Sequence, residues 1–402
     1  MTNATTNIAL VNNTGSANSY AYVTGLDLNK NNVPLFIQSD GKTVYYPESP
    51  SATQSALTAD CAISLGAKGA TTTITIPQIA GGRIWFCVDG KLTFLLNPGP
   101  AIVEPSVTNT ADANYNLNWG FCEFTYNSAQ LFVNISYVDF VALPIALSLL
   151  NTSGTTQTVQ GLPANGLDSV CSALKTQGGD WAKLVVTGSD GKNLRALSPN
   201  SGRVGDSSLF DNYYQSYVDQ VWTKYASEDL TVNTQASWGT VTGRVAADNN
   251  LLTFAGVGTF AQPAAGDVFS CSTGPFGSYP AATADEMGAI GARLAAALNR
   301  STLLVDADQP DGEKVATYYQ ADATNHYARV CHAANLDGRG YAFPYDDVNP
   351  SDSTEPDQAG TVYDANPQLL TVTGKNKKKA SQSFLEKLKG WMSSLKQKLL
   401  HK

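Results

Sequence analysis

The chain has 402 residues, 43% of them hydrophobic and 15% charged, so it can bury one large core or two moderate ones without disulfides. Its formal net charge is −8, but the segment from Lys375 to Lys402 carries nine lysines and one glutamate, which leaves −16 on the rest. This acidic body argues against binding along nucleic acid, where lysines and arginines must neutralise phosphates, and it suits an uncharged substrate.

The composition predicts a mainly β fold, because Thr, Ser, Asn, Gly and Tyr are abundant and Lys and Glu are sparse through the first 370 residues. From residue 8 to about residue 97, short apolar runs are separated by Gly, Asn and Pro. Strands are expected at residues 20–26, 33–38, 71–76, 83–88 and 92–95. This half of the chain should form a sandwich or a barrel.

Two further strands are expected at residues 118–126 and 131–141, joined by a polar turn, and each contains one acidic residue in an apolar setting. Alternation places Glu123 on the same face as Trp119, Thr125 and Asn127. Asp139 is the second such acid. The simplest structural explanation for either residue is a buried acid satisfied by backbone donors or by an arginine such as Arg83.

Helices are expected only after this point. They are predicted at residues 167–174, at 209–225, where tyrosines recur four residues apart, and at 287–298. Thr283 and Glu286 form a potential capping box before the last of these. We therefore expect a β-barrel domain at 1–146, a mixed α/β domain at 147–323, a return to the first domain at 324–374 and a tail at 375–402.

The tail has a lysine cluster followed by a segment with helical periodicity. Phe384, Leu388, Trp391, Leu395 and Leu399 share one face, and lysines lie on or beside the other. Such an amphipathic helix can dock on the acidic body or on a protein partner, or lie on an anionic membrane surface; a disordered or artificial extension is the remaining alternative. No apolar run reaches the roughly 18 residues expected of a membrane span.

No cofactor or metal is expected. The six cysteines are scattered without a short metal-binding spacing, although some can pair. His326 and His332 flank Cys331 but lack a second cluster, and the acids at residues 306–313 do not follow the spacing of a calcium loop. No secretory signal is visible at the N-terminus.

Two carboxyl groups in apolar strands suit glycoside hydrolysis, in which one acid protonates the leaving oxygen and a second carboxylate acts on the other side of the sugar ring. The aromatic surroundings of Glu123 favour its protonated form, as a general acid requires. Aromatic and amide side chains on the same face can stack on a sugar and bind its hydroxyls. The pattern therefore predicts a polysaccharide hydrolase.

Several segments carry a resemblance to a known family: residues 91–100, 103–106, 115–126, 135–139, 297–303, 324–329 and 337–347. Together they resemble glycoside hydrolase family 64, the thaumatin-like β-1,3-glucanases that release laminaripentaose, with the fungal branch the closer likeness. The resemblance covers residues 8–373. It implies a β-barrel or sandwich domain and a mixed α/β domain flanking a wide groove, with endo-cleavage of β-1,3-glucan and inversion at the anomeric carbon.

The resemblance also implies roles for individual residues. Glu123 matches the family's general acid, and Asp139, sixteen residues later, matches the general base. The predicted sugar contacts are Trp119, Thr125, Asn127, Tyr137, Arg339, Asp346 and Asp347. Action outside the cell or at the cell wall is the family expectation. We also expect a monomer that acts on β-1,3-glucan and, because of its acidic body, does not bind nucleic acid.

One geometric difficulty concerns the two acids. In a plain hairpin the partner of Glu123 is Asn134, so Asp139 lies five residues further along, beyond the separation of about 6.5–9.5 Å that an inverting pair requires. A bulge, a strong twist or a non-adjacent pairing must bring them together.

Two other functions are compatible with the sequence. One is a thaumatin-like protein that binds β-glucan without cutting it. The other is a membrane-associating protein whose tail is the active part. Retention of both Glu123 and Asp139 favours the hydrolase, because a binding protein needs no acid–base pair.

Overall fold

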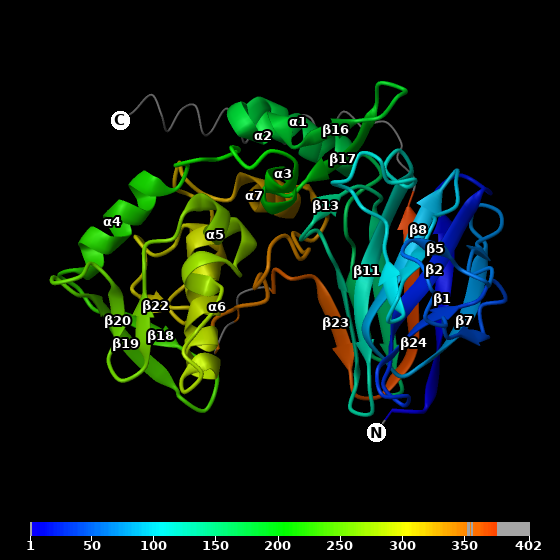
Figure 1. Cartoon of the computed structure of the whole chain (residues 1–402), viewed down its shortest axis with the longest axis horizontal. Coiled ribbons are helices and arrows are strands. Elements are labelled where there is room, and N and C mark those ends of the chain that lie inside the picture. The colour runs from blue at the N-terminus through cyan, green and yellow to red at the C-terminus, as the bar shows by residue number, and fades with distance from the viewer. Residues whose placement is uncertain (1, 352–353, 355–356, 376–402) are drawn as a thin grey trace.

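The computed structural model describes residues 2–351, 354 and 357–375, and these form a mainly β protein, as predicted (Figure 1). A β-sandwich occupies one side and most of the helices the other. The strands β11 and β23 lie on the side of the sandwich nearer the helices, and β7 lies on the far side (Figure 1).

The sandwich consists of two sheets. The β1 sheet contains, in spatial order, β15 (Thr156–Val159), β14 (Ile145–Asn151), β24 (Pro367–Lys375), β1 (Thr5–Asn13) and β7 (Thr71–Pro77). The β11 sheet contains, in spatial order, β23 (Thr361–Asp364), β12 (Leu131–Ile135), β11 (Asn118–Tyr126), β8 (Ile79–Val88), β2 (Ser19–Asp27), β3 (Val33–Ile37) and β4 (Val44–Tyr45), and β6 (Ile63–Ser64) pairs with β2. Only β1 and β24 pair in parallel within these two sheets.

Alternate residues of both sheets point inward and form the main core. Ile8 and Leu10 of β1 and Ile84 and Phe86 of β8 have no exposed surface. Each such side chain contributes about 1.5–3 kcal/mol on burial, so the facing apolar stripes account for the pairing of the two sheets.

A second, aromatic core covers part of the outer face of the β11 sheet. Residues 55–103 also form a small three-stranded sheet with the spatial order β10 (Ala101–Val103), β9 (Leu95–Asn97) and β5 (Ser55–Ala56). The core contains Trp85, Phe94, Trp119, Phe121 and Phe140. The outward-facing residues of the β11 sheet that belong to this aromatic core are therefore buried, whereas other outward-facing residues of the same sheet remain accessible to solvent.

The remaining elements lie between residues 140 and 334. The helices are α1 (Gly166–Gln177), α2 (Gly179–Lys183), α3 (Pro199–Gly205), α4 (Gln215–Tyr225), α5 (Ala265–Ser270), α6 (Ala284–Arg300) and α7 (His326–Ala334), with 3₁₀ turns at Gly274–Phe276 and Val315–Thr317. One small sheet has the order β13 (Phe140–Val141), β17 (Asn193–Leu197) and β16 (Val185–Thr187). Another has the order β21 (Gly258–Phe260), β20 (Leu252–Phe254), β19 (Thr240–Val245), β18 (Leu230–Asn233) and β22 (Asp308–Gln309).

Two predicted strands need correction. Residues 92–94 are not a strand, because the backbone of Thr93 is bonded on both sides to the side chain of Asn114, and the hydroxyl of Tyr22 accepts the N–H of Leu92. The predicted strand 131–141 is broken after Ile135 and resumes only as β13. The strands predicted at 20–26, 33–38, 71–76, 83–88 and 118–126 are confirmed.

The helices follow the same pattern of agreement and correction. Those predicted at 167–174 and 287–298 are confirmed as α1 and α6. The third begins at Gln215 rather than at 209, because Phe210 and Asn212 have positive φ values of 62° and 59°, which a helix excludes. Thr283 is the residue before α6, but its side chain makes no capping hydrogen bond.

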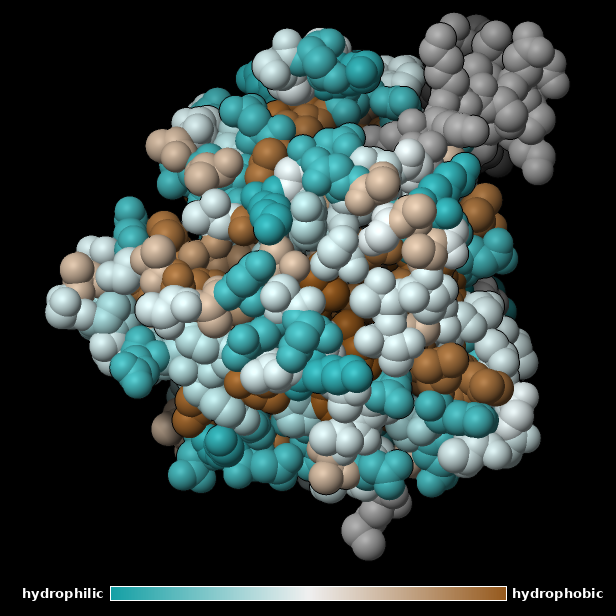
Figure 2. Space-filling view, turned by 90° about the vertical axis from the view of Figure 1, so that its right-hand side faces the viewer, coloured by the Kyte–Doolittle hydropathy of each residue, from teal (hydrophilic) through white to brown (hydrophobic). Residues whose placement is uncertain are grey.

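The cysteines contribute apolar volume to the two cores. Cys61, Cys87, Cys122, Cys271 and Cys331 are buried free thiols, so the expectation that some pair is not met. The predicted amphipathic helix of the tail falls within residues 376–402 and lies outside the described residues. No helix in the described part of the chain is both long and apolar enough to cross a membrane. On one face of the molecule, hydrophobic and hydrophilic residues are interspersed (Figure 2).

Candidate active site

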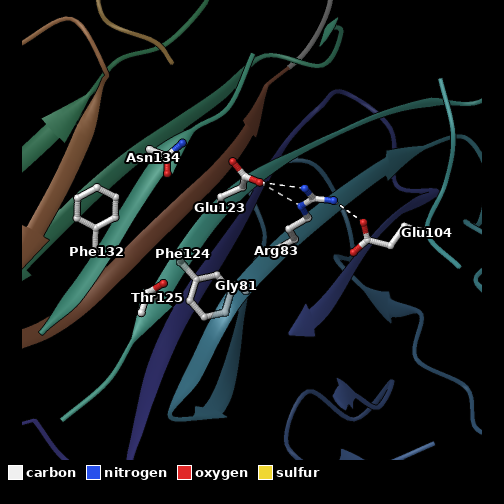
Figure 3. Close-up of a pocket in the computed structure, with 9 residues that line it drawn as sticks. Gly81, Arg83, Glu104, Glu123, Phe124, Thr125, Phe132 and Asn134 are labelled. Carbon is white, nitrogen blue, oxygen red and sulfur yellow. Dashed lines mark hydrogen bonds and ion pairs between the residues drawn. The ribbon is translucent and has the colours of Figure 1, made fainter. Parts of the chain in front are cut away.

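The centre of the candidate site is an ion-pair group on the outer face of the β11 sheet. Glu123 of β11 lies opposite Arg83 of β8, whose Nε and Nη2 approach Glu123 Oε1 at 3.2 and 3.1 Å. The Nη1 of the same guanidinium donates to Glu104, which directly follows β10. Arg83 therefore lies between two carboxylates (Figure 3).

A pocket of about 410 Å³ opens beside this group. Its lining residues come from β8, β11 and β12 and from the end of β10: Gly81, Gly82, Arg83, Glu104, Glu123, Phe124, Thr125, Phe132 and Asn134. The side chains of Arg83, Glu104 and Glu123 are 27%, 36% and 34% exposed. The carboxylates can therefore meet a ligand that enters from solvent.

A β-bulge in β8 shapes one wall of the pocket. The pairing of β8 with β11 shifts by one residue between Phe124 and Tyr126, and Gly81, at this point of β8, has a φ of +55°. Glycine adopts this left-handed conformation without the penalty that a Cβ imposes. Beside it, a Cβ on Gly82 would lie 2.4 Å from the Phe124 ring, so a larger residue would displace that ring.

The break after β12 changes the path of the chain that carries Asp139. The chain bends at Val138 and Asp139 and enters β13, where the ring of Phe140 packs on Trp119 and Phe121 at centroid distances of 4.8 and 5.9 Å. Phe121 precedes Glu123 by two residues on the outer face of β11. The chain therefore folds back over this face, and the charge of Glu123 acts on the Asp139 carboxyl.

The charges of the site interact. Burial raises the pKa of the Asp139 carboxyl, Arg83 opposes this, and the negative charge of Glu123 adds to it. Burial also raises the pKa of Glu104, again against the effect of Arg83 and with contributions from Glu123 and Asp139. The guanidinium of Arg83 thus acts on all three carboxyl groups, and the pKa values of two of them, Asp139 and Glu104, are raised.

Residues far along the chain hold the bend that carries Asp139. Tyr137 N donates to Tyr341 O at 2.7 Å, and Tyr327 Oη of α7 donates to Tyr137 O at 2.6 Å. The carbonyl of Asp139 accepts the N–H of Ser198 at 2.9 Å. The position of Asp139 therefore depends on α7, on the segment after it and on the start of α3.

The predicted sugar contacts on the catalytic strands have different positions. Thr125 lines the pocket. Asn127 lies in the turn after β11, where its Oδ1 accepts the N–H groups of Ala129 and Gln130. Trp119 and Tyr137 are only 1% and 3% exposed, with Trp119 Nε1 bonded to Asn114 O and Tyr137 Oη to Asn335. The side chains of Trp119 and Tyr137 are therefore buried and have no face available to a sugar, which corrects the prediction for these two residues.

The predicted contacts near the end of the chain also differ. Arg339 pairs with Asp357 at 2.9 Å and donates to the carbonyls of Thr158 and Thr361. Asp346 is fully buried, where it pairs with Arg300 at 3.3 Å and His332 at 3.0 Å. A carboxylate in that position cannot contact sugar, so this prediction is also corrected.

Asp347 differs from its neighbour. It is exposed, and its Oδ1 accepts the hydroxyl proton of Tyr341 at 2.7 Å. Tyr341 also bonds the end of β12 through its backbone, because its N–H donates to Ile135 O at 3.1 Å. Asp347 therefore retains access to solvent close to the segment that holds Asp139.

Arg83 was considered only as a structural partner of the acids, and the residues of the site that were not predicted as functional also include Glu104, Phe132 and Asn134. Asn134 was predicted as the cross-strand partner of Glu123, and this pairing is confirmed. Glu104 lies within one of the segments that carry the family resemblance, and an acid between Val103 and Pro105 is a usable signal. The alternation of residues along the strand places Phe132 on its outward face, which indicates exposure to solvent but does not identify a ligand.

The described residues contain no group of three or more His, Cys, Asp or Glu side chains that could hold a metal ion. His332, considered as a ligand, instead forms an ion pair with Asp346.

Comparison with known proteins identifies the family. A family model for glycoside hydrolase family 64, described as beta-1,3-glucanase, matches residues 4–373. Glucan endo-1,3-beta-glucosidases of Cellulosimicrobium cellulans and of Arthrobacter sp. (strain YCWD3) are each 30% identical over 305 residues, which is 75% of this chain and 53% of theirs. The chain spans about half the length of these curated relatives.

Solved structures agree with this result. A laminaripentaose-producing beta-1,3-glucanase in complex with laminaritetraose is 32% identical, with a TM-score of 0.82 over 94% of this chain and 100% of that chain. A beta-1,3-glucanase domain from Clostridium beijerinckii, at 20% identity, has the same fold, with a TM-score of 0.72 over 92% of this chain and 98% of that chain. The family match over almost the whole sequence shows that the chain belongs to glycoside hydrolase family 64.

Proposed function

We propose that this chain hydrolyses internal linkages of β-1,3-glucan with inversion, with Glu123 as general acid and Asp139 as general base. The observation that carries the proposal is the position of Glu123 in the lining of an open pocket, together with the interaction between its charge and the Asp139 carboxyl. Family membership supports it, as do relatives named glucan endo-1,3-beta-glucosidase and a related structure that contains laminaritetraose.

In the proposed reaction, protonated Glu123 donates its proton to the glycosidic oxygen as the bond from that oxygen to C1 breaks. Ionised Asp139 accepts a proton from a water molecule whose oxygen forms the new bond to C1 on the opposite face. The product carries the inverted anomeric configuration. Exchange of protons with solvent restores the protonated acid and the ionised base.

Arg83 and Glu104 would position and tune this pair. Arg83 fixes the Glu123 carboxyl through two donors to one oxygen. Because Glu104 binds the same guanidinium, the positive charge is divided between two carboxylates.

The test is hydrolysis of laminarin and curdlan by the full chain, with products separated by chromatography. We expect discrete oligosaccharides from the wild type and a loss of at least about a hundredfold in Glu123→Gln and in Asp139→Asn, because each lacks one partner of acid–base catalysis. Glu228→Gln and Asp248→Asn, at exposed positions outside the site, are matched controls that should keep full activity.

Binding of glucan by the wild type without any product would reject the enzyme and favour a glucan-binding protein. Hydrolysis that survives both substitutions would reject the two assigned residues. Action outside the cell, the monomeric state and a membrane or protein partner for residues 375–402 belong to the same proposal, and liposome flotation with and without the tail tests the last point.

A further inference from the structure

A buried histidine connects the two ends of the segment 338–346. His332 of α7 is 8% exposed, and its Nε2 lies 3.0 Å from Asp346 Oδ2 in an ion pair. Its Nδ1 lies 3.0 Å from the carbonyl oxygen of Gly338. A carbonyl oxygen and a carboxylate oxygen are both acceptors, so each ring nitrogen needs a proton to face its partner favourably. The contacts of His332 therefore suit an imidazolium.

The surroundings of the pair favour its charged form. Arg300 Nη2 lies 3.3 Å from Asp346 Oδ1, and Ala342 N–H donates to Asp346 Oδ2 at 2.9 Å. Burial opposes ionisation of Asp346, but the charges of His332 and Arg300 and these hydrogen bonds hold its pKa below the ordinary value. Burial would also lower the pKa of His332, but Asp346 and the carbonyl of Gly338 outweigh this effect and the repulsion from Arg300, so the pKa is raised.

The charges of this buried group balance when His332 is protonated. Arg300 and His332 are then its two cations, and Glu313 and Asp346 its two anions. Loss of the proton from His332 would leave one buried negative charge uncompensated, which is strongly unfavourable. The groups that surround the histidine come from three parts of the chain: Arg300 of α6, Glu313, Tyr318 and Tyr319 before α7, and Asp346 after it, with Cys331 adjacent in α7.

The segment between the two histidine contacts holds the bend that carries Asp139. Tyr341 lies within this segment, where its N–H donates to Ile135 O at 3.1 Å and its carbonyl accepts the N–H of Tyr137 at 2.7 Å. Asp139 follows Tyr137 by two residues. His332 thus fixes both ends of a segment whose middle contacts the bend.

We propose that protonated His332 is a positioning residue for the reaction: by holding Gly338 and Asp346, it keeps Tyr341 against the bend and so orients the Asp139 carboxyl. The inference rests on the proposed function and adds to it a residue that touches no substrate. Because the pKa of His332 is raised, its contribution is complete below the ordinary histidine value of 6.5 and is lost as pH rises through the raised value.

Nitrogen-15 NMR of the imidazole rings in the full chain tests the protonation of His332. The sequence has three histidines, so each ring is assigned by the loss of its signals in His326→Gln, His332→Gln or His401→Gln. At pH 6.5 we expect both nitrogens of His332 to be protonated in most molecules. His326 should be neutral at this pH, because burial and the charge of Arg329 lower its pKa to about 4. A neutral His332 ring would overturn the proposal.

Steady-state kinetics on laminarin test the effect on the reaction. Glutamine cannot supply the charge or both ring contacts, so we expect His332→Gln to lower kcat by about tenfold and to change KM by less than about twofold, because the proposed base is misplaced while the pocket is intact. The matched control is His326→Gln, which replaces a buried but neutral histidine of the same helix. Its kcat should stay within about twofold of the wild-type value.

Asp346→Asn gives a second test, because it removes the charge that His332 faces and keeps the size of the side chain. The His332 ring should then lose its proton at a lower pH, and kcat should fall with little change in KM. This variant decides the question if His332→Gln fails to fold.

An unchanged kcat in folded His332→Gln or Asp346→Asn, or equal losses in His332→Gln and His326→Gln, would overturn the positioning role and leave the assignment of Glu123 and Asp139 standing. A wild-type chain that released no oligosaccharide from laminarin would reject the proposed function, and the positioning role with it.

Discussion

At the scale of single residues, Arg83 determines the electrostatics of the site. Glu123 is faced by Arg83 from β8, by Glu104 from the end of β10 and by Asp139 from the bend after β12, with the buried thiol of Cys122 adjacent in sequence. The raised pKa of Asp139 has a direct consequence for the proposed base, which must be ionised to act. Activity should therefore appear, as pH rises, above the ordinary pKa of an aspartate.

Two substitutions of opposite charge test this arrangement. Arg83→Gln removes the cation that lowers the pKa of Asp139, so the acidic limb of the pH profile of kcat/KM should move to higher pH, by about one unit. Glu104→Gln removes a neighbouring anion and leaves Arg83 undivided, so the same limb should move to lower pH. The profile is measured on soluble laminarin.

Opposite movements of the two profiles would support the shared guanidinium. Movement in the same direction, or two profiles that coincide with that of the wild type, would contradict it. A uniform loss of activity without movement would indicate that Arg83 and Glu104 act only on the structure of the site.

At the scale of elements, the bend between β12 and β13 positions the proposed base. Three hydrogen bonds hold the backbone of residues 137–139: Tyr137 N–H donates to Tyr341 O, the Tyr327 hydroxyl donates to Tyr137 O, and Ser198 N–H donates to Asp139 O. A flexible chain at this point would place the Asp139 carboxyl in many orientations, whereas acid–base catalysis needs one. The bend therefore connects the helical part of the molecule with catalysis in the sandwich.

Removal of one of these hydrogen bonds gives a specific prediction. Tyr327→Phe leaves the buried carbonyl of Tyr137 without this donor, which should lower the free energy of unfolding by about 1–3 kcal/mol and reduce kcat with little change in KM. The matched control is Tyr214→Phe, because the buried hydroxyl of Tyr214 has no hydrogen-bond partner in the structure.

Urea denaturation and steady-state kinetics measure both variants. Tyr214→Phe should be as stable and as active as the wild type. Equal losses of stability and of kcat in the two variants would show that the loss of any buried tyrosine hydroxyl has this effect. The hydrogen bond from Tyr327 to Tyr137 O would then have no specific role in catalysis.

The elements that the sequence predicted well are those set by local pattern. Alternation in residues 118–126 predicted both the strand and its outward face, and the turn at 127–130 predicted the pairing of Glu123 with Asn134. The break after Ile135 could not be predicted, because it depends on Tyr327, 190 residues away from Tyr137 in the chain. Likewise, the sequence predicted Trp119 as an exposed residue that stacks on sugar. The rings of Trp85 and Phe140 cover it in the folded protein, and this contact could not be predicted from the local sequence.

At the scale of the whole molecule, a buried ion-pair group connects α6 with the segment that returns to the sandwich. Arg300 of α6 pairs with Glu313 and Asp346 at 3.3 Å, and all three residues are almost fully buried. A conformation that separated one partner from such a group would leave a buried charge without compensation, which is strongly unfavourable. The group therefore favours the conformation in which Arg300 of α6 contacts Glu313 and Asp346. We propose that the division at residues 1–146, 147–323 and 324–374 follows this organisation, with the last segment joining the two domains.

The central claim is that Glu123 and Asp139 form an inverting pair, and the anomeric configuration of the first product tests it most directly. Proton NMR of laminarin hydrolysis, recorded before mutarotation equilibrates the products, should show new reducing ends as the α-anomer first, since water attacks C1 from the face opposite the β-linked leaving group. Initial accumulation of the β-anomer would contradict the account, because it would mean that a carboxylate attacks C1 to form a covalent intermediate and that Asp139 is not a base for water.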